Sequence, residues 1–202
     1  MSAKREYANK NININKGITP MAFTRNKGEM TGDEAFARLS TLCAKGEHST
    51  GEMRQRMMRW GIDADTQQQV VDALVDARFV DDTRYARMYV DDKLRFDHWG
   101  PRKIAQGLML KGVDKHIIDN ALATISADAF DDILLPLLKA KARTIKGASA
   151  YERRCKLIRF AVQRGFMPDM ATRHAANFFN EADDFADEFA DDHTADTDAF
   201  DL

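Results

Sequence analysis

The hydrophobic positions recur along the chain in three segments of the same pattern, each of which ends at a glycine and one apolar residue. The segments span residues 52–62, 103–113 and 156–166. Counted back from each glycine, apolar residues stand eight, four and three positions earlier, which predicts one face of an α-helix. The glycine suits a left-handed turn after the helix, and the apolar residue behind it can pack back. The residues concerned are Met53, Met57, Met58 and Gly61; Ile104, Leu108, Met109 and Gly112; and Leu157, Ala161, Val162 and Gly165.

Two further helices accompany each segment, one after the glycine and one before the segment, the latter at roughly 33–45, 82–95 and 132–146. Capping boxes at Ser49 and Ser149 and the Gly100–Pro101 pair mark where the glycine-terminated helices begin. No segment alternates with a period of two, so no sheet is expected. The pattern predicts an all-α fold, an elongated array of three tandem three-helix repeats that share apolar surface.

The ends of the chain differ from the repeats in charge. Residues 1–30 carry six Lys/Arg and two Glu, whereas residues 181–202 carry ten Asp/Glu and neither Lys nor Arg. We expect a disordered, basic, Asn/Lys-rich arm at 1–30 and a disordered acidic tail at 181–202. The expected repeats between them cover 31–80, 81–130 and 131–180.

Composition narrows the class of protein. Cys43 and Cys155 have no Cys or His at ligand spacing, so they are expected to be reduced thiols. No apolar run approaches the length of a membrane span, and no signal peptide is evident. The expectation is a cytoplasmic protein without membrane association and, since no heptad or dimer face is evident, a monomer.

Paired aspartates raise the question of a metal site. Asp91–Asp92 lies in a Tyr-Val-Asp-Asp string that some polymerases use to hold metal, but the helical pattern here contradicts the strand–turn–strand context of that motif. Asp81–Asp82 stands where the 82–95 helix should begin, so Asp81 is predicted to be its N-cap, with Val80 and Tyr85 as a hydrophobic staple. A similar pair, Asp131–Asp132, suggests a helix start fifty residues later. We expect no metal site.

Catalytic motifs are not evident either. The five histidines are scattered, and His174, on an apolar helix face, is predicted to be a core or rim residue rather than a ligand. Neither a nucleophile motif nor a phosphate-binding glycine loop is found. The expectation is a protein that is not an enzyme and that has no cofactor.

Residues 79–122 resemble the signature region of the RecX family. That family shows an Asp-Asp-x-Arg-Phe/Tyr-Ala block, a Gly-Pro-x-x-Ile segment and a Lys-Gly-Ile/Val turn. The first and third repeats are similar to their family counterparts as well, so the likeness covers about residues 33–180. The matching signature residues are Asp81, Asp82, Arg84, Tyr85, Ala86, Gly100, Pro101, Ile104, Lys111 and Gly112.

The resemblance implies a non-enzymatic regulator of the RecA recombinase, with a part in DNA repair, homologous recombination and the SOS response. It implies binding in the groove of the RecA filament on single-stranded DNA, with suppression of ATP hydrolysis and strand exchange. The alternative is a direct nucleic-acid-binding helical protein, such as a helix-turn-helix repressor. A repressor should have one recognition helix and usually a dimer interface, whereas the basic residues here spread over an array.

The charge map suggests where an anionic partner binds. Residues 139–173 hold ten basic and two acidic residues, which phosphates or an acidic protein groove would complement. In the loop 95–103, Phe96 and Trp99 stand among basic residues and can stack on bases or anchor a protein interface, or Trp99 can pack between repeats. The candidate residues for binding the RecA filament, or weakly for binding DNA, are Arg95, Trp99, Arg102, Lys103, Lys111, Arg153, Lys156, Arg159 and Arg164.

Overall fold

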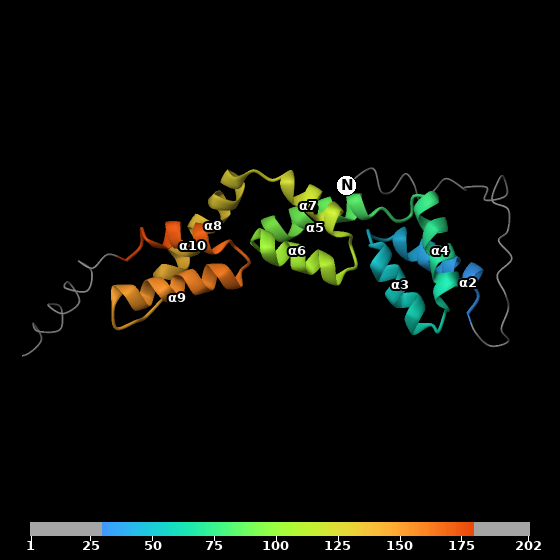
Figure 1. Ribbon diagram of the computed structural model, residues 1–202, viewed down its shortest axis with the longest axis horizontal. Helices are drawn as coiled ribbons and strands as arrows, with labels where there is room; N and C mark the ends of the chain where they lie inside the picture. The colour runs from blue at the N-terminus through green and yellow to red at the C-terminus, as the bar shows by residue number, and fades with distance from the viewer. Residues whose placement is uncertain (1–29, 180–202) are drawn as a thin grey trace, which may run out of the picture. The chain divides into compact units, whose positions relative to one another are not determined.

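The computed structural model describes residues 30–179, and this part of the chain is built from α-helices without a β-strand (Figure 1). The all-α prediction is therefore confirmed for these residues, whereas nearly all of the expected basic arm and the whole of the expected acidic tail lie outside them. The helices are α2 (Gly32–Cys43), α3 (Thr50–Arg59), α4 (Ala64–Asp76), α5 (Asp82–Arg95), α6 (Pro101–Leu110), α7 (Lys115–Ala123), α8 (Ala127–Ala142), α9 (Ala150–Gln163) and α10 (Pro168–Ala175).

The chain divides into two compact units. Among the described residues, unit 1 comprises 30–86 and Met109–Ile117, and unit 2 comprises Arg87–Leu108 and 118–179. Helices α5, α6 and α7 therefore have residues in both units. The repeat boundaries expected from the sequence stay a prediction.

The core of unit 1 lies where α2 and α3 pack on α4. Leu39, Met53, Met57 and Leu74 are fully buried there. The apolar positions eight and four residues before the glycine thus face the core, as predicted. The position three residues before it does not, because Met58 is 68% exposed. At about 100° per residue, that position lies outside the stripe that the other two define.

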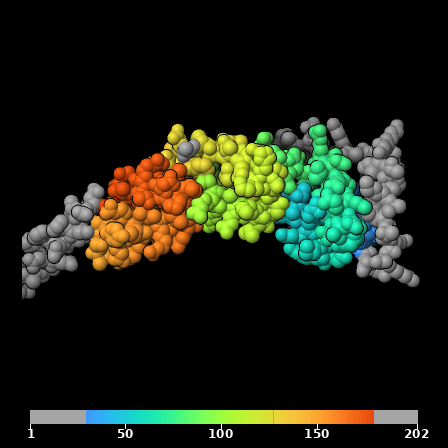
Figure 2. All heavy atoms as spheres, viewed as in Figure 1, coloured from blue at the N-terminus to red at the C-terminus, as the bar shows by residue number. Residues whose placement is uncertain are grey.

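The core of unit 2 is built in the same way. Helix α9 packs on α8 and α10, and its Leu157 and Ala161 are fully buried, as is Phe166 in the following turn. The space-filling view shows the orange atoms of α9 and the red atoms of α10 as one continuous body (Figure 2). Val162, which was predicted to face this core, is only half-buried because it lies at the edge of the stripe.

The glycine turns form as the sequence predicts. Gly61, Gly112 and Gly165 have φ of 75°, 73° and 92°, a left-handed conformation that glycine adopts without strain. At two of the turns the amide of the next residue donates back into the helix: Ile62 donates to the Met57 carbonyl at 3.1 Å, and Phe166 donates to the Ala161 carbonyl at 3.2 Å. The apolar residues that follow all three glycines are buried. The turns at Gly61 and Gly165 therefore end their helices in Schellman-type motifs.

Both predicted serine caps form, but only one of the two predicted capping boxes is complete. Ser49 and Glu52 complete a capping box at the start of α3. The Ser149 side chain accepts from the Glu152 amide at 3.2 Å, but the Glu152 carboxylate accepts from Ala148 at 2.8 Å instead of completing the box.

Helix α8 begins earlier than predicted. Its N-cap is Ser126, so the expected start near residue 132 is wrong, and Asp131–Asp132 lies inside the helix. The Ser126 hydroxyl accepts a hydrogen bond from the Ala129 amide and so caps the first turn. The helix continues through Pro136, which has no amide hydrogen and so removes one backbone hydrogen bond. Instead of capping the helix, the Asp131 carboxylate contacts the His174 ring: Oδ1 lies 2.8 Å from Nε2. His174 is therefore a half-buried rim residue, as predicted.

Both cysteines are free and half-buried. Burial raises the pKa of the Cys43 thiol to about 11, and the Glu47 carboxylate adds to this effect. Cys43 is therefore a poor nucleophile at neutral pH. None of the helices between residues 30 and 179 has the length and apolar character needed to span a bilayer.

Candidate functional site

Two backbone junctions of the same design organise the region of the signature residues. In unit 1, the start of α3 meets the turn after α6, where the Ser49 hydroxyl donates to the Lys111 carbonyl at 2.6 Å. A Cβ atom on Gly51 would clash with that carbonyl and lie 2.7 Å from the Gly112 Cα. We call this contact the α3 junction, and it requires glycine on both sides.

The second contact, the α6 junction, lies in unit 2. The amide of Gly100 donates to the Arg164 carbonyl at 2.8 Å, and the amide of Arg102 donates to Gly165 at 3.0 Å. A Cβ on Gly100 would clash with backbone atoms of Gly165 and Phe166. In both junctions, the start of one helix therefore rests on the glycine turn that ends the equivalent helix of the next repeat.

The signature aspartates serve two different helices. Asp81 Oδ1 accepts from the Arg84 amide at 3.0 Å, so Asp81 is the N-cap of α5, as predicted. Asp82 accepts from the amide of Thr50 at 2.8 Å and from its hydroxyl at 2.6 Å, and so caps the start of α3. The part of the chain that the structure describes holds no cluster of three potential metal-ligating side chains. Both carboxylates of the pair are thus engaged in helix capping.

The signature lysine is an ion-pair partner. Lys111 Nζ lies 2.7 Å from Glu52 Oε1 in unit 1. Burial by itself would raise the pKa of Glu52, but the Lys111 ammonium and the Ser49 amide outweigh this effect and lower it. Lys111 was predicted to bind a partner, and the structure places it in this half-buried ion pair beside the α3 junction.

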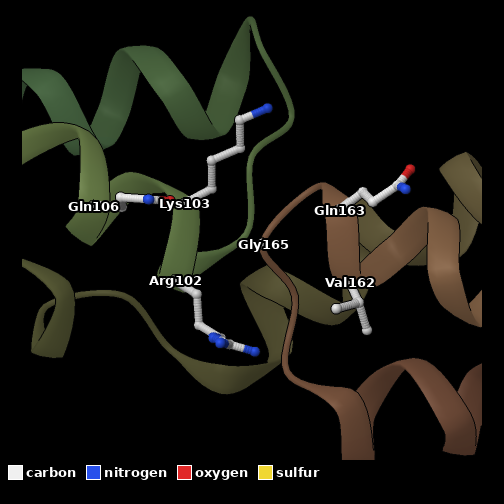
Figure 3. A pocket seen from close by; sticks show the side chains of 6 residues that line it. All are labelled: Arg102, Lys103, Gln106, Val162, Gln163 and Gly165. Atoms are coloured by element: carbon white, nitrogen blue, oxygen red, sulfur yellow. The ribbon is translucent and has the colours of Figure 1, made fainter.

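A cavity of about 410 Å³ opens at the α6 junction in unit 2. Arg102, Lys103 and Gln106 line it from α6, and Val162 and Gln163 line it from α9, with Gly165 in the adjoining turn (Figure 3). Arg102 and Lys103 leave the start of α6 in different directions (Figure 3). The lining offers guanidinium, ammonium and amide donors together with one apolar wall, a combination that suits an anionic group carrying some apolar surface.

The Trp99 ring contacts Lys103, one of the residues that line the cavity. Lys103 Nζ lies 4.4 Å and Lys93 Nζ 5.0 Å from the centre of the Trp99 ring, which is half-buried. Lys93 also pairs with Asp97 at 2.5 Å, and this hydrogen bond raises its pKa. Trp99 is thus occupied by two cations, while Phe96, at 78% exposed, is the aromatic residue of this loop that faces solvent.

The predicted cations other than Lys103 and Lys111 fall into two groups. Arg102 and Arg159 are exposed, and no side-chain ion pair or hydrogen bond holds either of them within residues 30–179. Arg159 lies one helical turn before Gln163 and therefore on the same side of α9. In the other group, Arg95 pairs with Asp91 at 2.6 Å, Lys156 pairs with Glu152 at 2.6 Å, the Arg153 guanidinium lies 5.3 Å from the Phe179 ring, and Arg164 donates to the Asp97 carbonyl at 3.1 Å.

We define the basic face as Arg102, Lys103, Gln106, Arg159 and Gln163, which surround or adjoin the cavity. The charge pattern of the sequence indicated this region. It gave no sign of Lys93 beneath the loop or of the bond between Asp82 and Thr50, because both depend on contacts that only the folded chain brings about.

Comparison with known proteins identifies the signature region. Residues 81–122 match the family model described as "RecX, second three-helix domain". A regulatory protein RecX from Leuconostoc citreum (strain KM20) is 29% identical over 158 residues, covering 75% of this chain and 59% of that protein. One from Clostridium botulinum (strain Eklund 17B / Type B) is 30% identical over 132 residues, covering 63% and 61%. The chain thus spans about three-fifths of the length of these relatives.

Solved structures show the same fold. The crystal structure of RecX from Lactobacillus salivarius has a TM-score of 0.66 at 18% identity, covering 73% of this chain and 96% of that one. A second structure, of a regulatory protein RecX, has a TM-score of 0.65 at 19% identity, covering 69% and 70%. The signature match, the sequence relatives and the shared fold confirm the resemblance seen in the sequence: residues 81–122 match the second three-helix domain of RecX, and the chain is similar to regulatory proteins RecX in sequence and in fold.

Proposed function

We propose that this protein regulates the RecA recombinase by binding the RecA filament on single-stranded DNA, and that it has no catalytic activity of its own. Bound there, it lowers ATP hydrolysis and strand exchange. The observation that carries the proposal is the RecX signature at 81–122, because the relatives that share it are named regulatory proteins. On this proposal the protein acts as a monomer in the cytoplasm and needs no cofactor.

The basic face of unit 2 supports the proposal by its chemistry. Arg102 and Arg159 present exposed guanidinium groups, and Gln106 and Gln163 add neutral donors beside them. Guanidinium groups form paired hydrogen bonds with phosphate and carboxylate oxygens. A nucleoprotein filament offers both kinds of oxygen. We therefore place the contact with the filament at this face.

Helix capping and junction contacts occupy the signature residues themselves. Gly100 and Gly112 allow two backbones to approach closely, and Asp81 and Asp82 cap two helix starts. These residues act by holding α6 and its cationic side chains in place. We propose that their contribution to regulation is indirect, through the position of the basic face.

The test is the single-stranded-DNA-dependent ATPase of RecA, measured with increasing amounts of this protein. We expect the rate to fall at sub-stoichiometric ratios, while the protein alone hydrolyses no ATP. An unchanged rate at equimolar protein would refute the proposal. A helix-turn-helix repressor, the alternative, would instead bind one duplex sequence far more tightly than others, so competition between duplexes of different sequence separates the two functions.

A further inference from the structure

One segment of this chain carries a charge opposite to that of the basic face. Residues 181–202 contain ten Asp/Glu and no Lys or Arg, whereas the basic face contains Arg102, Lys103 and Arg159 and no acidic residue. We propose that the acidic segment 181–202 binds the basic face of unit 2 and competes there with polyanionic partners. This goes beyond the proposed function, because the contact lies within one chain and does not depend on RecA.

The acidic segment starts close enough to reach the face. Phe179, the last residue described, has its ring 5.3 Å from the Arg153 guanidinium. From Arg153 to Gln163, α9 rises by about 15 Å. Asp183 to Glu188 follow Phe179 by four to nine residues, and an extended chain of that length spans about 13–30 Å. The first cluster of carboxylates is therefore within reach of the cavity.

The chemistry of the face matches that of the segment. Arg102 and Arg159 are exposed and can pair with carboxylates without the loss of an existing ion pair. The acidic segment also contains Phe185 and Phe189, and Val162 gives the cavity an apolar wall. A phenyl ring against this wall would anchor the carboxylates beside the guanidinium groups. A segment that served only to keep the chain in solution would not need these rings.

Tethering makes such a weak contact effective. Exposed ion pairs contribute little individually, so the free segment would bind with an affinity on the order of 0.1 mM, comparable to weak nonspecific binding. On a short tether its effective concentration is on the order of 1 mM. The ratio of the two values predicts about tenfold weaker binding of a competing polyanion at low salt, with a smaller effect as salt screens the charges.

The experiment compares the full-length chain with a full-length variant in which six carboxylates become amides. The substitutions are Asp183→Asn, Asp184→Asn, Asp187→Asn, Glu188→Gln, Asp191→Asn and Asp192→Asn. Without any ligand, the ¹H–¹⁵N spectra should differ at residues 102–106 and 159–165 as well as in the segment itself. Differences confined to the segment would overturn the proposal, since they would mean that it touches nothing on the basic face.

A second measurement tests the competition. Fluorescence anisotropy with a labelled oligodeoxythymidine at about 50 mM salt should show the variant binding about tenfold more tightly than the wild type. The ratio should approach one at about 300 mM salt. Equal affinities at low salt would overturn the competition even if the spectra reveal a contact. Neither measurement contains RecA, so its outcome is separate from that of the ATPase test.

Discussion

Replacing Gly100 with alanine should lower the unfolding free energy by disturbing the α6 junction, whereas the same change at Gly46 should not lower it. A Cβ on Gly100 would clash with backbone atoms of Gly165 and Phe166, whereas a Cβ on Gly46 meets nothing within 4 Å. Backbone atoms held in a turn cannot move aside as the end of a flexible side chain can. The start of α6 must therefore move away from the turn.

The structure gives the size of this effect. Moving α6 away weakens the Gly100–Arg164 and Arg102–Gly165 hydrogen bonds, now 2.8 and 3.0 Å long. Two weakened bonds cost about 1–3 kcal/mol, and overpacking costs about 1–3 kcal/mol more. Alanine also lowers the conformational entropy of the unfolded chain, which offsets about 0.4–1 kcal/mol of this loss. The net loss of unfolding free energy should be about 1–5 kcal/mol.

Urea unfolding followed by circular dichroism measures this difference. Gly46→Ala is the matched control and should leave the unfolding free energy unchanged or raise it by up to about 1 kcal/mol, because only the unfolded-state term applies. If the two variants differ by less than about 0.5 kcal/mol, the α6 junction does not have the close backbone contact described above, and the reasoning fails.

Other predictions concern unit 1. Asp82→Asn should lower the unfolding free energy by about 1–2 kcal/mol, measured in urea, because a neutral amide caps Thr50 less well. Because the pKa of Glu52 is lowered in the folded state, its interactions stabilise unit 1 above the ordinary carboxyl pKa and are lost as the pH falls through the folded value. Lys111→Met should therefore flatten the decline of the melting temperature on acidification. Millimolar Mg²⁺ should leave the melting temperature of the wild type unchanged.

Each of these has a clear contrary result. Wild-type stability of the Asp82→Asn variant would mean that this carboxylate does not cap α3. An unchanged acid profile in the Lys111→Met variant would mean that the ammonium group does not hold the Glu52 carboxylate in its charged form. A rise in melting temperature with Mg²⁺ that disappears in Asp82→Asn would show that the paired aspartates bind metal after all.

Local signals in the sequence predicted much of the fold. Ser49 and Asp81 act as caps, and Gly61 and Gly165 end their helices, because capping and left-handed turns depend on neighbouring residues alone. The predicted start of α8 was wrong because the Asp131–Asp132 pair resembled the earlier capping signal, whereas the actual N-cap, Ser126, has no distinctive neighbours in the sequence.

The candidate site was less predictable, because charge pattern cannot tell an available cation from one already engaged. Arg164 and Arg159 both lie in the basic region of the sequence. Yet Arg164 donates to the Asp97 carbonyl and holds the loop after α5, whereas Arg159 is exposed on α9. The role of Asp82 was equally hidden, since its partner Thr50 lies 32 residues earlier in the chain.

The central claim is that the basic face of unit 2 is where the anionic partner binds. The most direct test is inhibition of the RecA ATPase by Arg102→Glu/Arg159→Glu, compared with Arg38→Glu/Arg87→Glu, which makes the same charge change at exposed helical positions outside this face. Glutamate near the start of α6 suits the helix dipole, so the first variant should stay folded.

Two lost charge contacts and the repulsion that replaces them amount to about 2 kcal/mol, which corresponds to more than tenfold in affinity. The account therefore predicts that inhibition by Arg102→Glu/Arg159→Glu requires at least about tenfold more protein than inhibition by the wild type, whereas the control variant stays within about twofold of the wild type. Equal inhibition by the two variants, with both folded, would contradict the claim.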